Sequence, residues 1–536
     1  MKETMLNNRL HINDVVSVIF LILFTALFAF TFVDFSIAPF EDAAMLMRYA
    51  EHFAQGYGIV WNIGEKPVDG ATDFLFMVVL GLFTKAGMPL EFATRFIGFS
   101  SHVVTVVIVY WASRKYFLAN LIPALVTAIY LAMGPGLHYV AAYFGTPFFA
   151  LFACITWYMA LNIIVNGESR IRSLFFAVAA LVTALIRPEG VILTGLMMLG
   201  IVYISGVKRS LNTIRGYLGI FFVCGGAYFL WRWHYFGFPL PNPFYKKGGG
   251  SIYLDSLVGS LKNTIHLCLP FLPAFIMGFY SSKTIRMTIG VLIPIVGFAL
   301  AFVMISDEMN YGARFQYALL PIILMSWWPL VRVIKDDWPL PLWSQLNLQK
   351  KMTLILLAIV LSIGMLGYTY MVGRIKCRYF RDGRYNIASL LADYKDRHFA
   401  MATTEAGLLP LYSRWNAMDT WGLNDPWIAH NGRITEAYLG ALQPHVVMFH
   451  ASFSPLVSCQ GTGAWFEMVM TMKRYVEKNG YVLAAVFGEN PYDTHYYYVR
   501  SDFSESKEIS SRIQTTEYFW HRTGRKAINY ALLTTK

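Results

Sequence analysis

Long apolar segments dominate the sequence and restrict the chain to a membrane fold. Stretches of about 17 to 22 mostly apolar residues can cross the hydrocarbon core of a bilayer as helices. They occur at 13–33, 93–113, 118–134, 146–166, 172–187, 189–206, 216–233, 262–280, 287–305, 315–333 and 352–372. Of the 536 residues, 56% are hydrophobic and 14% are charged, which is more apolar than a water-soluble domain can bury. The sequence therefore predicts a polytopic α-helical membrane protein with about eleven transmembrane helices.

The charges between these segments orient the chain. The formal net charge is +12, but the basic residues stand in short clusters between apolar segments, a pattern typical of the positive-inside rule rather than of nucleic-acid binding. With a cytoplasmic N-terminus every predicted inner loop is basic, and the odd number of crossings puts the C-terminus outside. The run from Val15 to Val33 lacks a small-residue cleavage site, so we expect it to remain as the first anchor. We expect no nucleic-acid partner.

The first outer loop is long and covers about residues 34–92. It contains the apolar stretch from Thr72 to Leu90, which we place in the outer interface because a twelfth crossing would move basic clusters outside. Apolar residues at helical spacing after Pro39 predict an amphipathic interfacial helix. Glu41 and Asp42 open this helix, where carboxylates either cap the first turn or take part in chemistry.

The chain divides into a transmembrane domain, residues 1–372, and an extracytoplasmic α/β domain, residues 373–536, where the composition becomes polar. Alternating apolar residues in this second domain predict strands at 398–405, 445–451, 481–489 and 495–502. An amphipathic helix is predicted at 463–480. Cys377 and Cys459 also lie in this part, and the sequence leaves open whether they form a disulfide.

Many polar residues fall on one predicted face of the membrane. They are Glu41, Asp42, Arg48, Arg187, Glu189, Arg232, Asn242, Tyr245, Lys246, Lys247, Asp307 and Arg314. Each alone is explained by an ion pair or by snorkelling to the interface. Together they indicate an anionic lipid headgroup that Arg and Lys bind, with a carboxylate placed to remove a proton.

Five motifs resemble a known family in sequence order. They read "EDAAMLMRYAEHFAQGYGIVWNIGEKPVDGATDFLF", "LIRPEG", "LPNPFYKKGG", "MNYGARFQYALLP" and "TEAGLLPLYS" with "MDTWGLNDP". These segments are similar to those of bacterial membrane glycosyltransferases related to the mycobacterial terminal β-(1→2) arabinofuranosyltransferase, which have the integral-membrane GT-C fold. The resemblance covers most of the chain. It implies a GT-C fold, a location in the bacterial plasma membrane and a polyprenyl-phosphate sugar as donor.

Residue roles follow from the resemblance by position. The family's carboxylate pair falls on Glu41 and Asp42, and Asp42 is the predicted base that deprotonates an acceptor hydroxyl. Donor phosphate contacts are predicted for Lys246, Arg187, Arg314 and Arg232, and further substrate contacts for Arg48, Glu189, Asn242, Tyr245 and Asp307. Direct displacement of the lipid phosphate would invert the anomeric configuration. Asp419, Gly422 and Asp425 of the outer domain would hold the acceptor or brace the rim.

Three positions depart from the family pattern. The first carboxylate is Glu41 where the family has Asp, which leaves open which of the pair is the base. The usual outer-loop glutamate is Gly145 here, and the usual G-Y-T-N segment reads "GATD". An envelope glycan or glycolipid is the expected acceptor, and an arabinose donor is not established.

Two other kinds of protein remain open on the sequence. A non-enzymatic lipid or polysaccharide translocator, or a membrane-anchored scaffold, would also be polytopic, although we find neither charges at mid-membrane nor repeated halves. An acyl- or phosphoethanolamine-type transferase would need a nucleophile or zinc, and the histidines show no metal-ligand spacing. We therefore assign no metal site and no cofactor, and leave a divalent cation held by acidic side chains open.

Overall fold

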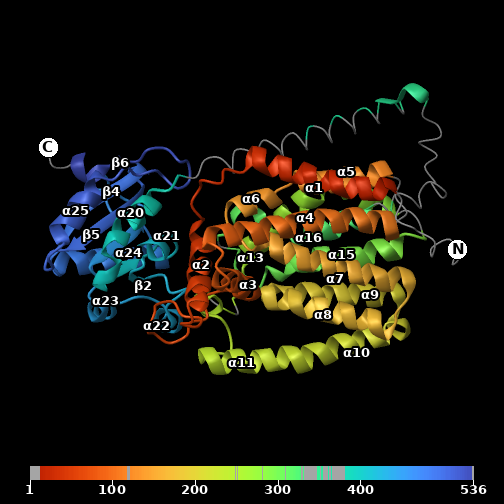
Figure 1. Cartoon of the computed structure of the whole chain (residues 1–536), viewed down its shortest axis with the longest axis horizontal. Helices are drawn as coiled ribbons and strands as arrows, with labels where there is room; N and C mark the ends of the chain where they lie inside the picture. Colours follow the sequence, from red (N-terminus) through yellow and green to blue (C-terminus); the bar gives the residue numbers. More distant parts are fainter. Residues whose placement is uncertain are drawn as a thin grey trace.

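The protein consists of a helical bundle and a sheet domain joined through one upright helix (Figure 1). The computed structural model describes residues 12–116, 121–247, 249, 251–279, 282–307, 309–327, 330, 347–350 and 381–533, with scattered positions between 352 and 364. In Figure 1 the long helices run side by side on the right, the sheet lies on the left, and α2 stands across their ends between them. The predicted domain boundary at 373 and Cys377 lie outside the described residues.

The bundle contains helices of very different length. They are α1 (Ile12–Phe32), α2 (Glu41–Ala54), α3 (Phe74–Lys85), α4 (Leu90–Tyr116), α5 (Leu121–Ala132), α6 (Gly136–Ala141), α7 (Thr146–Asn166), α8 (Arg170–Ile186), α9 (Glu189–Ser205), α10 (Leu211–Ile220), α11 (Gly226–Phe236), α12 (Asn242–Lys246), α13 (Leu254–Cys268), α14 (Leu272–Gly278), α15 (Ile285–Ala301) and α16 (Leu319–Leu324). A π-helical turn, Phe221–Gly225, joins α10 to α11 without a break.

Five helical segments in the described residues are long and apolar enough to cross a membrane. They are Ile12–Thr31, Leu90–Tyr116, Leu121–Ala141, Thr146–Asn166 and Leu211–Phe236. Shorter apolar helices are Phe74–Lys85, Glu189–Ser205 and Ile285–Ala301. The chain is thus a multi-pass helical membrane protein, and the count of about eleven crossings is not confirmed.

The predicted span at 262–280 is wrong as a single helix. The segment is divided between α13, a 3-10 turn over Leu269–Phe271 and α14. Pro270 and Pro273 lie at the break, and proline lacks the N–H that would continue the helical hydrogen bonds. Most of the predicted span at 352–372 lies outside the described residues.

Helix α2 forms where it was predicted, and its polar face is buried by protein. Arg48, Glu51 and His52 are buried, and burial lowers the pKa of His52 to about 4. The sheet domain covers this polar face, which sequence periodicity alone cannot reveal. Helix α3 has 12 residues, a length of about 18 Å, which is shorter than the hydrocarbon core.

The second domain contains a six-stranded mixed sheet with strand order β2-β1-β3-β5-β4-β6. Its elements are α20 (Gly383–Leu391), β1 (Ala400–Thr403), α21 (Leu408–Ser413), β2 (Asn416–Asp419), α22 (Pro426–Asn431), α23 (Glu436–Leu442), β3 (Val446–Ala451), α24 (Ala464–Lys478), β4 (Tyr481–Asn490), β5 (Asp493–Arg500), α25 (Ser506–Thr515) and β6 (Ile528–Asn529). The four predicted strands and the predicted helix are confirmed. Strands β2 and β6 were not predicted, because they are too short to show an alternating pattern.

Two parallel strands direct their following loops toward the bundle. Strands β2 and β1 are parallel, with Thr403 opposite Asp419, so their carboxyl ends meet at one edge of the sheet. The loop after β1 reaches α2, where Gly407 N–H donates to the Glu41 carboxylate. The loop after β2 places Leu423 in the wall of a pocket beside α2. The carboxyl edge of the sheet therefore forms the junction with the bundle.

Arg48 ties the two parts together from α2. Its guanidinium donates to the carbonyls of Trp61, Trp415 and Pro410 and to Asn62 Oδ1. The distances are 2.9 Å to Trp61 O, 3.1 Å to Asn62 Oδ1 and 2.9 Å to Trp415 O. All four acceptors are protein groups from the first loop and the sheet domain, so Arg48 stabilises the junction between the two parts of the protein.

We expect Gly407→Ala to destabilise the junction. An added Cβ at this position would overlap the backbone carbonyl of Glu41, and backbone cannot rotate away as a side chain can. The overlap should cost about 1–3 kcal/mol, a typical value for overpacking. Thermal unfolding of the purified chain in detergent, compared with Gly432→Ala, measures the effect. A Cβ added at Gly432 would meet no atom within 4 Å, whereas the φ of +87° is strained for alanine. The control therefore measures the cost of backbone strain in the absence of atomic overlap. Equal melting temperatures for wild type and Gly407→Ala would contradict the assigned close packing.

Candidate functional site

A pocket of about 310 Å³ lies between the bundle, α2 and the sheet domain. Six charged residues line it: Asp42, Asp73, Arg187, Glu189, Lys247 and Arg314. Apolar side chains complete the wall, among them Met45, Leu46, Phe144, Ile192, Leu240, Phe244 and Ile305. Its volume lies in the range of small-molecule sites, and the mixture suits a ligand with an anionic and an apolar part. We call it the α2 pocket.

Asp42 faces the α2 pocket from the first turn of α2. Its Oδ2 accepts a charge-assisted hydrogen bond of 2.5 Å from Arg314 Nη2. The Arg314 guanidinium also lies over the Phe144 ring, 4.3 Å from its centroid. Arg314 Nε is buried without a hydrogen-bond partner. One edge of this guanidinium is therefore available to an anion, since buried donors are normally paired.

The loop that carries Arg314 is held by Asn310. Its side chain donates to Asp307 Oδ1 at 2.6 Å and to Gln316 Oε1 at 2.8 Å, and accepts from Phe315 N–H at 3.1 Å. Gly312, next but one to Arg314, has a φ of +61°, a left-handed conformation that glycine adopts without steric cost. Asp307 thus supports the loop and is not among the residues that line the pocket.

A second ion-pair group lies on the opposite wall. Arg187, between α8 and α9, pairs with Asp73 at 2.8 Å and with Glu189 at 3.2 Å. Burial raises the pKa of Asp73, opposed by the charge of Arg187. Glu189 Oε2 is buried without a hydrogen-bond partner. The predicted boundary between the spans at 172–187 and 189–206 is confirmed, and the break at Pro188 brings Arg187 and Glu189 into the pocket together.

Asp73 was not predicted, although the sequence carried a signal for it. A Cβ at Gly145 would lie 2.8 Å from Asp73 Oδ2, so this carboxylate occupies the space of a side chain at position 145. The two departures noted above, "GATD" and Gly145, are therefore neighbours in space.

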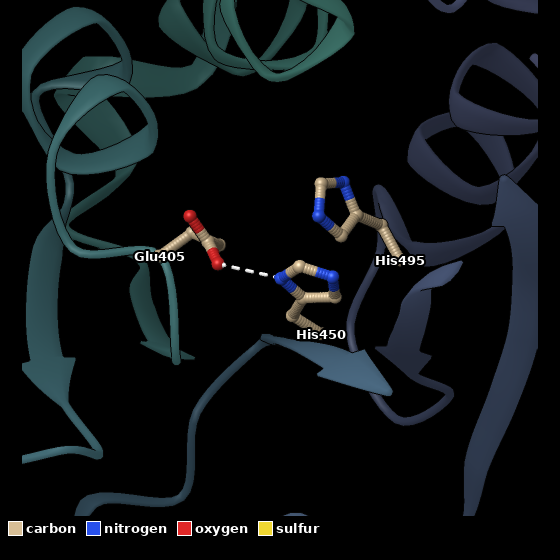
Figure 2. A group of neighbouring side chains, drawn as sticks. All are labelled: Glu405, His450 and His495. Atoms are coloured by element: carbon tan, nitrogen blue, oxygen red, sulfur yellow. Dashed lines mark hydrogen bonds and ion pairs between the residues drawn. The ribbon is translucent and has the colours of Figure 1, made fainter. Parts of the chain in front are cut away.

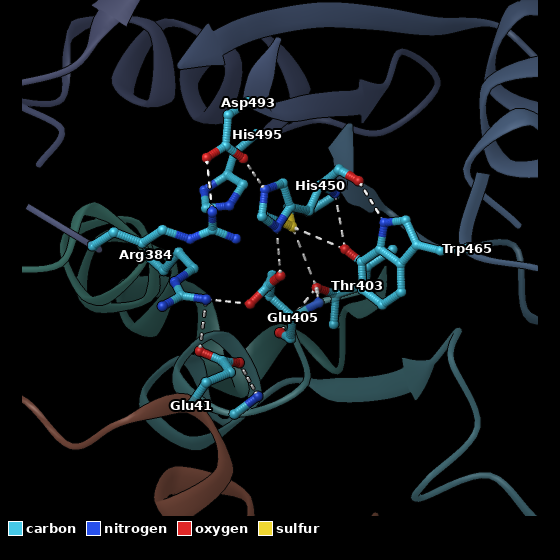
Figure 3. A network of polar contacts seen from close by, with 12 residues as sticks. Glu41, Arg384, Thr403, Glu405, His450, Trp465, Asp493 and His495 are labelled. Carbon is cyan, nitrogen blue, oxygen red and sulfur yellow. Dashed lines mark hydrogen bonds and ion pairs between the residues drawn. The ribbon is translucent and has the colours of Figure 1, made fainter. Parts of the chain in front are cut away.

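Glu41 points away from the pocket into the sheet domain (Figure 3). It accepts from the N–H groups of Gly407 and Leu408 and lies 3.3 Å from Arg384. Arg384 also pairs with Glu405 and, at 2.5 Å, with Asp382. Burial raises the pKa of Glu41 to about 8, although Arg384 opposes that shift. Of the two adjacent carboxylates, Asp42 alone lines the pocket.

Lys247 lines the pocket, whereas Lys246 lies outside it. Lys246 Nζ donates to the Gly432 carbonyl at 2.7 Å and lies over the Trp421 ring, 4.3 Å from its centroid. Tyr245 packs beside it against the His430 ring, with 4.3 Å between ring centroids. The sequence identified the motif "FYKKGG" but not which of its lysines faces the pocket. That depends on the end of α12 at Lys246, after which Lys247 turns into the pocket.

Arg232 and Asn242 form a layer outside the pocket lining. Arg232 binds Asp69 through two hydrogen bonds, Nε to Oδ2 at 2.6 Å and Nη2 to Oδ1 at 2.7 Å. Asn242 N–H donates to the Asp69 carbonyl at 3.0 Å, which fixes the start of α12. These residues connect the first loop with the segment that carries Lys247.

The predicted outer-domain residues shape the pocket rim. Asp419 accepts from the N–H groups of Trp421, Gly422 and Asn424 at 2.9–3.1 Å, and Asp425 caps α22 through Ile428 N–H at 2.9 Å. These bonds hold the turn that presents Leu423. Asp419 and Asp425 thus brace the rim, one of the two roles expected for them.

The fold and the pocket define a class: a polytopic helical membrane protein with a charged pocket where its bundle meets a sheet domain. Two solved structures are similar to this chain in fold. ArnT from Cupriavidus metallidurans bound to undecaprenyl phosphate matches with a TM-score of 0.56 and 14% identity, covering 90% of this chain and 97% of that one. The apo oligosaccharyltransferase of Archaeoglobus fulgidus matches with a TM-score of 0.53 and 11% identity, covering 92% and 75%.

These similarities establish the GT-C fold for the chain. A sequence family described as a domain of unknown function (DUF8728) matches residues 375–508, of which 381–508 are described and belong to the sheet domain. No curated protein matches the chain. The arabinofuranosyltransferase resemblance is therefore supported at the level of fold, and its finer assignment is not confirmed.

Proposed function

We propose that the protein is an inverting glycosyltransferase that moves a sugar from a polyprenyl-phosphate donor to an envelope glycan or glycolipid. The observation that carries the proposal is that Asp42 and three cations, Arg187, Arg314 and Lys247, share one pocket. A carboxylate can take a proton from a hydroxyl, and the cations can bind a phosphate. The transfer would take place on the outer face of the bacterial inner membrane, as the charge pattern of the loops favours.

The chemistry is a direct displacement. Asp42 accepts the proton of an acceptor hydroxyl, whose oxygen attacks the anomeric carbon of the donor sugar. The bond between that carbon and the phosphate oxygen breaks, and the electron pair leaves with the polyprenyl phosphate. Arg314, Arg187 and Lys247 stabilise the charge that develops on the phosphate. Attack opposite to the leaving group inverts the anomeric configuration.

Donor binding would also prepare the base. Arg314 pairs with Asp42, and a bound phosphate would compete for the same guanidinium. When Arg314 turns toward the phosphate, Asp42 loses its ion-pair partner, and its oxygen becomes available to the acceptor hydroxyl.

The donor class has two kinds of support. The pocket wall combines cations with apolar side chains, as a phosphate joined to a lipid requires. A solved protein of the same fold contains undecaprenyl phosphate. The motif resemblance favours an arabinofuranosyl-like sugar.

Running the transfer assay with EDTA tests whether a divalent cation takes part.

Mass spectrometry of envelope glycans and lipid-linked sugars tests the proposal. Cells lacking the gene should lose one sugar from an envelope glycan and accumulate its lipid-phosphate donor. Complementation with the wild-type chain should restore the sugar, whereas Asp42→Asn should not. Restoration by Asp42→Asn would favour the competing function, a translocator or membrane-anchored scaffold that acts without this carboxylate.

We expect Lys247→Ala to weaken binding of the lipid phosphate by about 10-fold or more. A charge-assisted hydrogen bond contributes about 1.5–3 kcal/mol, and each 1.4 kcal/mol is a factor of ten. Titration of undecaprenyl phosphate into the purified chain measures the change. Lys246→Ala is the matched control. It removes the ammonium group of the adjacent lysine, which donates to Gly432 O and does not line the pocket. A larger loss in Lys246→Ala than in Lys247→Ala would reverse the assignment.

A further inference from the structure

Two histidines and a glutamate meet inside the sheet domain (Figure 2). None of the three lines the α2 pocket. Glu405 follows β1, His450 lies in β3 and His495 in β5. Strands β1, β3 and β5 are neighbours, and the antiparallel register places His450 directly opposite His495. One potential ligand atom from each of the three residues lies within 4.8 Å of the other two. The sheet therefore gathers three metal-ligand side chains that stand about 45 residues apart in sequence.

The hydrogen bonds around the cluster orient both imidazole rings. His450 Nδ1 lies 3.1 Å from Glu405 Oε1, and His450 Nε2 lies 2.5 Å from Asp493 Oδ1 (Figure 3). His495 Nδ1 lies 2.6 Å from the Tyr518 hydroxyl. His495 is fully buried, and its Nε2 has no hydrogen-bond partner. A buried nitrogen without a partner is uncommon, and a bound ion is one of the groups that can satisfy it.

We propose that Glu405, His450 and His495 bind a zinc ion. Glu405 Oε1, His450 Nδ1 and His495 Nε2 are the ligand atoms, a His₂Glu set that suits Zn²⁺. The fourth position takes water or His521, whose Nδ1 is a second buried nitrogen without a partner. Tetrahedral zinc with bonds of about 2.0–2.1 Å holds its ligand atoms about 3.3 Å apart, so the side chains close by at most about 1.5 Å.

The groups behind these ligands match what zinc ligation requires. A metal-bound imidazole usually donates its other N–H to a carboxylate or another oxygen, and Asp493 and the Tyr518 hydroxyl stand at those positions. The second oxygen of Glu405 is held by Arg384. Zinc takes the place of the proton between His450 Nδ1 and Glu405, so one proton is released for each ion bound.

The site adjoins the junction between the two parts of the protein. Arg384 connects Glu405 to Glu41 at the start of α2 (Figure 3). Bound zinc fixes Glu405 and, through Arg384, the contact of the sheet domain with α2. We therefore assign the ion a structural role that is independent of the proposed transfer reaction.

Metal analysis of the full chain tests the proposal. The chain is purified in detergent, stripped with chelator, incubated with zinc chloride, washed and analysed by plasma mass spectrometry. The wild type should retain about one zinc per chain, and His495→Gln and His450→Gln should lose it. His398→Asn is the matched control, since this exposed histidine of the same domain has a left-handed φ of +55° that asparagine also adopts. It should retain the ion.

Two measurements on the unmodified chain keep the test independent of how the variants fold. Loading with Co²⁺ instead of zinc should produce the visible absorption of a tetrahedral cobalt site, and zinc should abolish it. Zinc should also raise the melting temperature of the chelator-stripped chain. A wild-type chain that retains no zinc, or His495→Gln that retains as much as wild type, would overturn the proposal. The cluster would then be a charge network held by a proton on His450.

Discussion

Asp42→Asn is expected to lower the rate of sugar transfer by about 10²–10⁴-fold, the usual contribution of a general base. The amide keeps the size of the side chain and can still accept from Arg314, so the pocket should remain folded. What it loses is the negative charge, and with it the basicity that takes the proton from the acceptor hydroxyl. Transfer from a synthetic polyprenyl-phosphate sugar by the chain in liposomes measures the effect, and binding of undecaprenyl phosphate serves as a check on the pocket.

Glu41→Gln is the matched control for this experiment. Burial raises the pKa of the Glu41 carboxyl group, so glutamine, which is neutral and of the same size, is a mild replacement there. The contacts of Glu41 are with Gly407, Leu408 and Arg384, and it does not line the pocket. We expect transfer within a few-fold of wild type. Loss of transfer in Glu41→Gln with full activity in Asp42→Asn would exchange the roles of the two residues.

Arg384→Met is expected to have the largest effect on stability, a loss of about 3–5 kcal/mol, as when one partner of a buried ion pair is removed. The Arg384 side chain is 5% exposed and neutralises Glu41, Asp382 and Glu405 together. Methionine fills a similar volume but leaves these buried carboxylates without their cation. Thermal unfolding in detergent and the rate of proteolysis in the sheet domain measure the loss.

Arg397→Met provides the comparison for Arg384. It removes an arginine from the same domain whose side chain is 64% exposed and whose partner, Glu505, lies 3.2 Å away. Exposed ion pairs contribute about 0–1 kcal/mol, so its melting temperature should stay close to that of wild type. Similar shifts for the two variants would mean that Arg384 contributes no more than a surface ion pair.

Local patterns in the sequence predicted most elements of secondary structure. The apolar segments gave the long helices, Pro188 the break before α9, and alternating residues the strands β1, β3, β4 and β5. Prediction was wrong at 262–280, where total hydrophobicity masked the effect of Pro270 and Pro273. The environment of α2 could not be predicted, because an amphipathic pattern does not show whether water or another domain covers the polar face of the helix.

The charged pocket was predicted only in part, because local sequence patterns do not show which side chains meet in space. Asp42, Arg187, Glu189 and Arg314 were identified and line it. Lys247 was named among the polar residues, but the phosphate contact was assigned to Lys246, and Asp73 was missed. Successive residues of a helix point about 100° apart, so the side chains of Glu41 and Asp42 leave α2 in different directions and need not share one environment. Only the packing of α2 decides which of the two faces the pocket.

The sequence by itself determined the membrane class, the two-part organisation and the segments that supply the pocket, because each follows from short-range periodicity and charge. Tertiary structure decided which neighbours meet. Glu405, His450 and His495 become adjacent only through the pairing of β1, β3 and β5, and Asp73 reaches the space beside Gly145 only when the first loop folds back. Contacts between residues far apart in the chain leave no periodic signal, so the chemistry they create appears only in the fold.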